Sequence, residues 1–125
     1  MSTIYYDRDT SLQPLQGKKI VIFGYGSQGH AHALNHKDSG LDVTVCLRSG
    51  SSAIERARAA GLTVLTDADA AARMADVVMI VVPDENQKKL WDEHLKKNLK
   101  KGAALFFSHG FNIHFKRVVP RPDLD

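Results

Sequence analysis

The chain has 125 residues, 43% of them hydrophobic, and its 17 basic and 14 acidic residues give a net charge of +3. This length suits one compact domain and leaves no room for a second full one. We expect a soluble protein without a membrane partner, because the N-terminus lacks a secretory signal's apolar core and no stretch could cross a bilayer. The single cysteine, Cys46, excludes an internal disulfide and favours a reducing, cytoplasmic location.

The first half of the chain predicts two strand-helix units. Residues 19–23 are short, β-branched and apolar, as expected of a strand that is buried on both faces. Residues 27–37 favour a helix, residues 42–47 a second strand and residues 52–60 a second helix. A glycine follows each helix and can end it in a left-handed conformation.

The alternation continues through the second half of the chain. In order, the pattern predicts a strand at 63–65, a helix at 67–74, a strand at 77–82, a helix at 84–97 and a strand at 103–107. Thr66 is the expected cap of the first of these helices. Alternating strands and helices with short links predict an α/β fold, a Rossmann-type doubly wound parallel sheet in one domain over residues 1–125.

A glycine-rich turn lies between the first strand and the first helix, and it reads Gly24-Tyr25-Gly26-Ser27-Gln28-Gly29. The pattern GxGxxG is weak alone, but here it stands where a dinucleotide-binding turn requires it. Gly24 can make the tight turn, Gly26 can admit the pyrophosphate and Gly29 can let helix and strand pack closely. Ser27 and Gln28 can add contacts at the helix N-terminus. The alternative is a glycine-rich turn without a ligand.

The end of the second strand indicates which dinucleotide binds. An NAD-binding protein usually presents Asp or Glu there to the ribose hydroxyls. This chain instead offers Arg48, Ser51 and Ser52, which complement a 2′-phosphate through charge-assisted hydrogen bonds. NADPH is therefore the predicted cofactor. The alternative is a polar surface loop in which Ser52 caps the next helix, and both roles are compatible for Ser52.

Two other patterns suggest binding functions that we reject. His32 and His36 are one helical turn apart, but no HExxH motif is present and the positive helix N-terminus disfavours a nearby cation. The lysine pairs along residues 88–101 lack an aromatic stacking platform, and Trp91 fits the packed side of a helix. We therefore predict neither a metal site nor a nucleic-acid partner.

Five segments together resemble one family. They read GYGSQGHAHALN, LRSGSS, VPDENQ, FFSHGFNIHF and VVPRPDLD, and they are similar to ketol-acid reductoisomerase over essentially the whole chain. The resemblance implies an N-terminal Rossmann domain for NADPH. It also implies Mg²⁺-dependent alkyl migration in 2-acetolactate or 2-aceto-2-hydroxybutanoate, small 2-hydroxy-2-alkyl-3-keto acids, followed by reduction to 2,3-dihydroxy acids in valine and isoleucine synthesis.

The resemblance also assigns roles to individual positions. It places the phosphate-binding turn at Tyr25 to Gln28, the 2′-phosphate loop at Arg48, Ser51 and Ser52, the family's active-site histidine at His109, and the segment beside the nicotinamide ribose at Asp84, Glu85, Asn86 and Gln87. His109 directly follows the last predicted strand, at the sheet edge where open α/β sheets bind ligands. The alternative for His109 is a packing role in its loop.

The family continues beyond a segment like VVPRPDLD into another strand and a helical domain that supplies most of the Mg²⁺ and substrate site. By resemblance, we expect that domain as the partner, and a homo-oligomer at full length. The 125-residue chain is expected to bind NADPH without completing the reaction alone. Two alternatives stay open at this point: a nucleotide-sensing regulatory module, and an NADP-dependent reductase domain of the 6-phosphogluconate dehydrogenase type.

Overall fold

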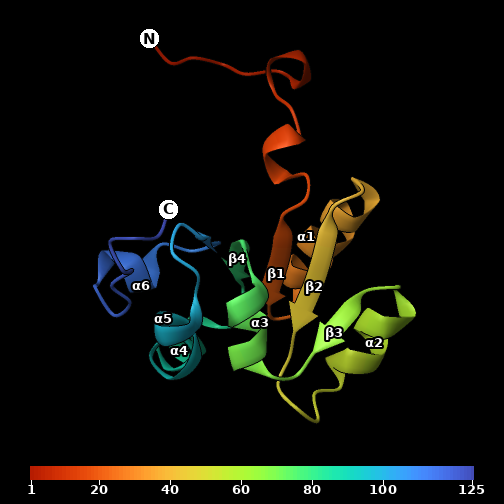
Figure 1. Cartoon of the computed structure of the whole chain (residues 1–125), viewed down its shortest axis with the longest axis vertical. Coiled ribbons are helices and arrows are strands. Elements are labelled where there is room, and N and C mark those ends of the chain that lie inside the picture. The colour runs from red at the N-terminus through yellow and green to blue at the C-terminus, as the bar shows by residue number, and fades with distance from the viewer.

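A parallel five-stranded sheet forms the centre of the computed structural model, which describes residues 1–125, and its strand order is β3-β2-β1-β4-β5 (Figure 1). The strands are β1 (Lys19–Phe23), β2 (Asp42–Cys46), β3 (Thr63–Leu65), β4 (Val77–Ile80) and β5 (Ala104–Phe107). The predicted α/β fold is confirmed, with β2, β4 and β5 slightly shorter than expected. The order reverses between β1 and β4, the switch point at which doubly wound sheets bind ligands.

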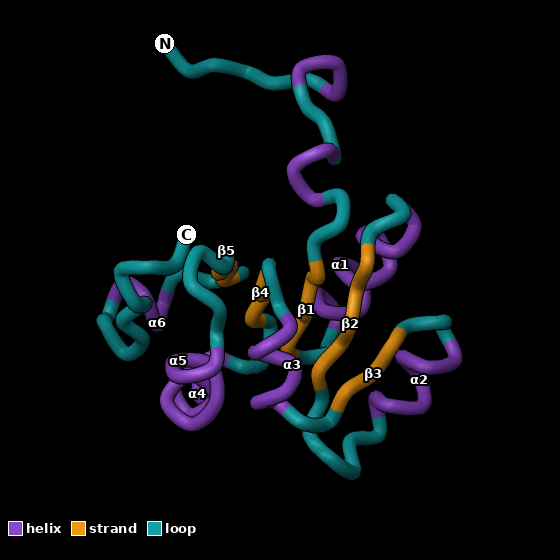
Figure 2. Tube along the Cα trace, viewed as in Figure 1, coloured by secondary structure: helices purple, strands orange, loops and turns teal.

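Six helices surround the sheet (Figure 2): α1 (Ser27–Asp38), α2 (Ala53–Ala59), α3 (Ala68–Met74), α4 (Asp84–Leu90), α5 (Lys96–Asn98) and α6 (Phe111–His114). The single helix predicted over 84–97 is continuous, but its middle turn, Trp91–Leu95, is wider than an α-turn because the N–H of Lys96 donates to the oxygen of Trp91. The short helix α6 was not predicted. None of the helices is long and apolar enough to span a membrane.

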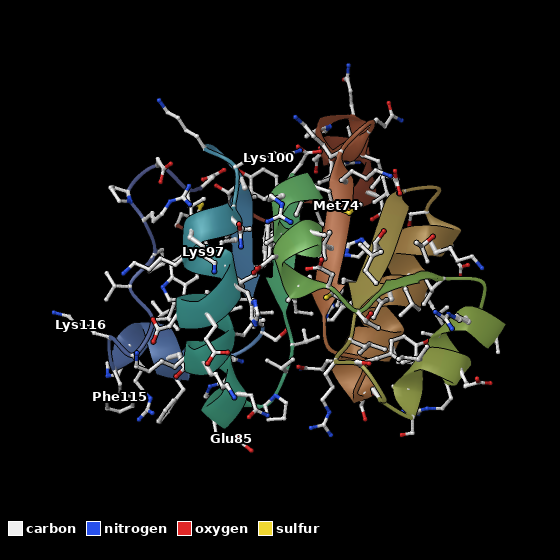
Figure 3. All side chains as sticks on the ribbon, turned by 60° about the horizontal axis from the view of Figure 1, so that its bottom comes forward. Met74, Glu85, Lys97, Lys100, Phe115 and Lys116 are labelled. Atoms are coloured by element: carbon white, nitrogen blue, oxygen red, sulfur yellow. The ribbon has the colours of Figure 1, made fainter.

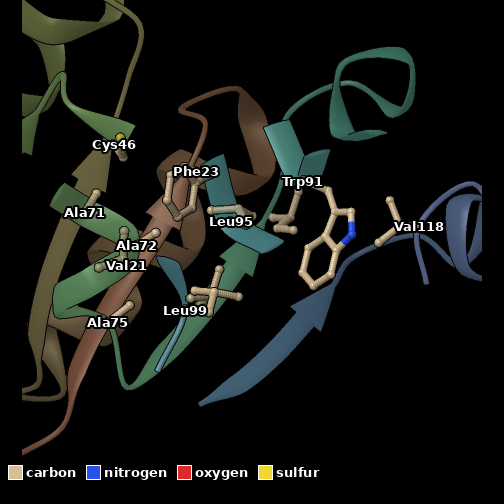
Figure 4. Close-up of a cluster of buried hydrophobic side chains, with 12 residues drawn as sticks. Val21, Phe23, Cys46, Ala71, Ala72, Ala75, Trp91, Leu95, Leu99 and Val118 are labelled. Carbon is tan, nitrogen blue, oxygen red and sulfur yellow. The ribbon is translucent and has the colours of Figure 1, made fainter. Parts of the chain in front are cut away.

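Two apolar clusters cover the two faces of the sheet because successive residues of β1 point to opposite sides. Val21 and Phe23 join a cluster that includes Trp91 and residues of α3 (Figure 4). Ile20 and Ile22 join the other cluster, which includes residues of α1 and α2. The burial of Trp91 confirms the packing role predicted for it. Both faces of the sheet are therefore covered by packed side chains, and the carboxyl ends of the strands remain accessible to a ligand.

The two residues predicted to cap helices, Thr66 and Ser52, do not make the expected side-chain hydrogen bonds. The N–H of Ala70 donates to Oδ1 of Asp67 at 3.0 Å, so Asp67 caps α3 and the prediction of Thr66 is wrong. Ser52 precedes α2 but makes no cap bond; instead the N–H of Ala53 donates to Oγ of Ser51 at 3.2 Å. The Ser52 side chain is thus not used by the helix that follows it.

The last residues of the chain run beside β5. The N–H of Gly102 donates to the oxygen of Asp123 at 2.7 Å, the N–H of Asp125 to the oxygen of Ala103 at 3.0 Å, and the N–H of Leu105 to the oxygen of Asp125 at 2.9 Å. The last two of these bonds have the pattern of one parallel bridge, between Asp125 and Ala104. Beyond Leu105 no backbone partner continues it.

Asp76 joins the amino ends of two strands, and it carries a pH-dependent prediction. Its Oδ2 accepts from the N–H of Lys19 at 2.8 Å, and its Oδ1 from Nζ of Lys100 at 3.1 Å; Lys100 also reaches the oxygen of nearby Met74 (Figure 3). The Lys19 bond first, and then Lys100, hold the pKa of Asp76 below its usual range. The ionised form is therefore the one that stabilises the fold.

We expect Asp76→Asn to lower the free energy of unfolding by about 1–2 kcal/mol at pH 7, as for loss of a charged hydrogen bond. Because the pKa is depressed in the folded state, this contribution is complete above the unfolded pKa of about 4 and disappears as pH falls through the folded value. Urea titrations of the wild type and the variant measure the difference between their free energies of unfolding, which should be smaller at pH 3 than at pH 7. Asp42→Asn is the control, because Asp42 pairs with Lys19 at an exposed site and should change little.

Candidate nucleotide-binding site

The glycine turn between β1 and α1 is shaped by close backbone contacts. Gly24 has φ +113°, and a Cβ there would lie 3.0 Å from the nitrogen of Val82. A Cβ on Gly29 would lie 2.6 Å from the oxygen of Gly24. These contacts confirm the tight turn predicted at Gly24 and the close packing predicted at Gly29. A Cβ on Gly26 would meet no protein atom within 4 Å, so the space above it is open.

The N-terminus of α1 has the properties of an anion-binding site. Gly26 is its N-cap residue, and no side chain accepts a cap hydrogen bond there. The first backbone N–H groups of the helix are therefore left for a ligand, at the positive end of the helix dipole. Ser27 and Gln28 are exposed beside them. The geometry fits a phosphate at this turn.

A cleft of about 740 Å³ crosses the carboxyl ends of β1, β2 and β4. Among the predicted site residues, it brings together Gly24, Arg48, Ser51 and Asn86. The cleft is also lined by residues that were not predicted to belong to the site, from the loop after β2, the β3–α3 loop, α3, the loop after β4, α4 and the wide turn that follows α4: Leu47, Ser49, Thr66, Asp67, Asp69, Val82, Pro83, Lys89, Leu90, Glu93 and His94. Ser52, Asp84, Glu85 and Gln87 do not line it.

A second cavity of about 340 Å³ lies at the glycine turn. Its walls are Tyr25, Gly26, Ser27, His30 and Arg56, so three predicted phosphate-turn residues lie here. Arg56 stands 6.0 Å from the centre of the Tyr25 ring and adds a cation to the turn. Arg56 was not predicted from the sequence, although its position one helical turn after Ser52 is a signal that could have indicated it.

The loop after β2 turns sharply before α2. Gly50 has φ +78°, and the N–H of Ser51 donates to the oxygen of Arg48 at 3.2 Å. Arg48 is exposed and lines the cleft together with Ser51, whereas Ser52 is exposed outside it. A guanidinium and a hydroxyl thus stand at the end of β2, where no carboxylate is present.

Cys46 lines the cleft, and its thiol is unreactive at neutral pH. Burial first, and then the charge of Asp67, raise the pKa of its thiol to about 11. The thiol is therefore protonated at neutral pH and acts as a small apolar side chain rather than a nucleophile.

Asp69 and His94 form a polar pair in the cleft that the sequence analysis missed. Nδ1 of His94 lies 2.8 Å from Oδ1 of Asp69, which also accepts from Nδ2 of Asn98 at 2.9 Å. The hydrogen bond with His94 is the largest cause that lowers the pKa of Asp69. Because 25 residues separate the two partners, no local pattern could have indicated this pair.

His109 stands at the carboxyl end of β5, as predicted, and its side chain is 69% exposed. Its Nδ1 accepts from the N–H of Phe111 at 3.2 Å and lies 3.6 Å from Oδ2 of Asp84, the first residue of α4. The structure therefore brings together two residues that the sequence placed at one end of the site. Glu85 and Asn86 are exposed on the first turn of α4, with Glu85 near its outer end in Figure 3.

Gln87 differs from its neighbours because only 2% of it is exposed. Its amide donates to the oxygen of Val82 at 3.0 Å and to Oδ1 of Asp84 at 3.3 Å. Gln87 thus lies behind the surface at which Asp84 and Asn86 stand, and its polar atoms are used inside the protein.

Comparisons with known proteins bear on this site. A family model described as acetohydroxy acid isomeroreductase, NADPH-binding domain, matches residues 14–125. A solved NADH-preferring ketol-acid reductoisomerase from an uncultured archean has 42% sequence identity and a TM-score of 0.90, with 98% of this chain and 38% of that chain covered. The chain thus spans well under half the length of that relative.

More distant structures share the fold. A semialdehyde dehydrogenase NAD-binding protein from Cupriavidus necator, solved with calcium and NAD, has 25% identity and a TM-score of 0.74 over 87% of this chain and 39% of that chain. A structure described as an oxidoreductase from Jannaschia sp. CCS1 has 19% identity and a TM-score of 0.73, with 86% of this chain and 38% of that chain covered. Their range shows that the fold alone would not select among the three hypotheses, whereas the family match favours the first. The chain belongs to the acetohydroxy acid isomeroreductase, or ketol-acid reductoisomerase, family and corresponds to its N-terminal NADPH-binding domain.

Proposed function

We propose that this chain holds NADPH, in preference to NADH, for a ketol-acid reductoisomerase. The observation that carries the preference is the pair of Arg48 and Ser51 at the end of β2, in the cleft wall. A guanidinium complements a 2′-phosphate with two parallel hydrogen bonds, whereas a ribose diol is usually held by a carboxylate, which this loop lacks. The 42% identical relative is described as NADH-preferring, so cofactor preference has to be argued from this loop itself.

The residues present fit the remainder of the cofactor. The open space above Gly26 and the free N–H groups of α1 suit the pyrophosphate, and Arg56 supplies a nearby positive charge. The cleft of about 740 Å³ beside the β2 loop and α4 has room for an adenosine. NADPH supplies a hydride when it is bound, and the residues Asp84 to Asn86 and His109 are proposed to surround its nicotinamide end.

The donor set does not fit Mg²⁺. No three His, Cys, Asp or Glu side chains converge in the structure, and a hard cation needs several oxygen ligands at close quarters. We propose that the Mg²⁺ ligands for alkyl migration belong to the family's helical domain, and that this chain contributes His109 to the shared substrate site. On that basis, the 125-residue chain should not turn over 2-acetolactate by itself; steady turnover with Mg²⁺ and NADPH would disprove this.

Calorimetry tests the cofactor assignment directly. NADPH and NADH are titrated into the chain, and adenosine 2′,5′-bisphosphate and adenosine 5′-monophosphate are titrated as fragments that differ by the 2′-phosphate. We expect NADPH to bind at least about tenfold more tightly than NADH, the effect of one charge-assisted hydrogen bond, and the bisphosphate to show the same advantage. Equal binding of NADPH and NADH would refute the 2′-phosphate loop, and no binding of either would refute the nucleotide site.

A further inference from the structure

Two buried amides join α4 to the turn that carries His109. Asn112 is fully buried and Gln87 is 2% exposed, and apart from them Thr44 is the only polar residue in the buried set. Nδ2 of Asn112 donates to Oε1 of Gln87 at 2.8 Å. Two of three buried polar residues are therefore partners of each other, although 25 positions separate them in the chain.

The pair is anchored on both sides. Nδ2 of Asn112 also donates to the backbone oxygen of Asp84 at 3.0 Å, while Nε2 of Gln87 donates to the oxygen of Val82 and to Oδ1 of Asp84. The backbone oxygen of Asn112 accepts from the N–H groups of Arg117 and Val118. The amide orientations follow from these partners, because a flipped Asn112 would turn its oxygen toward a carbonyl.

These contacts converge on the two groups beside Nδ1 of His109. Asp84, whose Oδ2 lies 3.6 Å from that nitrogen, is held through both its backbone oxygen and its Oδ1. Phe111, whose N–H donates to the same nitrogen, directly precedes Asn112. An Nδ1 that accepts a hydrogen bond carries no proton, so the proton of the neutral ring is on Nε2.

Packing alone does not account for this arrangement. Oδ1 of Asn112 is buried without a hydrogen-bond partner, and an unsatisfied buried acceptor is unfavourable. An apolar pair could fill the same space without that cost. The amides are better explained by what they hold in place.

We propose that Asn112 and Gln87 are positioning residues for His109: they fix the turn so that Nδ1 accepts from Phe111 and Nε2–H is the donor offered to a substrate oxygen. The role of Nε2–H toward a substrate rests on the proposed function. The geometry of the ring, however, can be tested on the chain without any cofactor.

The test is the tautomer ratio of His109, measured by long-range ¹H–¹⁵N NMR on the 125-residue chain above the range in which histidine is protonated. In the wild type, His109 should populate the Nδ1–H form less than the exposed ring of His114, which serves as an internal reference. In Asn112→Ala, the ratio of the Nδ1–H form to the Nε2–H form should rise about fivefold, the change in equilibrium constant that corresponds to one lost hydrogen bond.

Two further variants keep the test decisive. Asn98→Ala removes the same side chain at a site that binds Asp69 and the oxygen of His94, so it should leave His109 unchanged. Gln87→Met keeps the shape of the α4 side chain but removes its hydrogen bonds, and it decides the matter if Asn112→Ala does not fold. A wild-type tautomer ratio in folded Asn112→Ala would overturn the inference, as would the same ratio in Gln87→Met if Asn112→Ala does not fold. A shift in Asn98→Ala equal to the shift in Asn112→Ala would overturn it as well. NADPH calorimetry on the wild-type chain tests the proposed function separately.

Discussion

Arg48→Asp is expected to weaken NADPH binding by about 100-fold, because it removes charge-assisted hydrogen bonds to the 2′-phosphate and places a negative charge beside it. NADH should bind as well as before or better, since a carboxylate at the end of β2 is the usual acceptor for the ribose hydroxyls. The preference should therefore invert. Calorimetry with both cofactors measures the ratio of the NADPH and NADH dissociation constants for the wild-type chain and for the variant.

The matched control is Arg58→Asp, which changes the net charge by the same amount. Arg58 is exposed on the last turn of α2 and lines neither cavity. Its substitution should weaken NADPH binding by no more than about twofold, because screened surface charges act weakly at a distance. Equal losses of NADPH affinity in both variants would mean that Arg48 acts only through the long-range electrostatic field of the protein. An unchanged affinity in Arg48→Asp would mean that Arg48 does not belong to the site.

Gly29→Ala and Gly26→Ala should separate folding from binding within a single turn. A Cβ on Gly29 would stand 2.6 Å from the oxygen of Gly24 and 3.0 Å from its carbonyl carbon, and neither backbone atom is free to move. We expect Gly29→Ala to lower the free energy of unfolding by about 3 kcal/mol, at the upper end of overpacking effects. Urea denaturation measures this loss without a ligand.

Gly26→Ala adds the same methyl group where no protein atom lies within 4 Å and where φ is −74°, a value that alanine adopts readily. Its stability should stay within about 0.5 kcal/mol of the wild type. NADPH binding should nevertheless fall at least about tenfold, because the methyl group takes up space needed by the pyrophosphate. A stable Gly29→Ala, or a Gly26→Ala that binds normally, would contradict the turn's assigned geometry.

Local patterns predicted the strands and the glycine turn because each is determined by a few neighbouring residues. The run at 19–23 is apolar enough to be a buried strand in any α/β sheet, and Gly24 and Gly29 meet within one turn. Asp67 was missed as a cap for an equally local reason, since Thr66 and Asp67 are both good capping residues and only the backbone conformation selects between them.

The parts of the site that escaped prediction depend on contacts between distant segments. Asp69 meets His94, and Asn112 meets Gln87, only after α3, α4 and α6 have packed. The wide turn at Trp91–Leu95 is likewise set by packing, because the sequence of that stretch is an ordinary helical one. The resemblance therefore assigned Gln87 to the segment expected beside the nicotinamide ribose, but it could not indicate that this residue lies inside the protein.

The incomplete ladder beside β5 has a consequence for handling the isolated chain. The hydrogen bonds to Asp123 and Asp125 reach only to Leu105, and Phe106, which is 51% exposed, lies beyond them. An open, aromatic strand edge is a template for strand addition by other chains. The isolated 125-residue chain should therefore self-associate through this edge as its concentration rises, and light scattering against concentration would measure it.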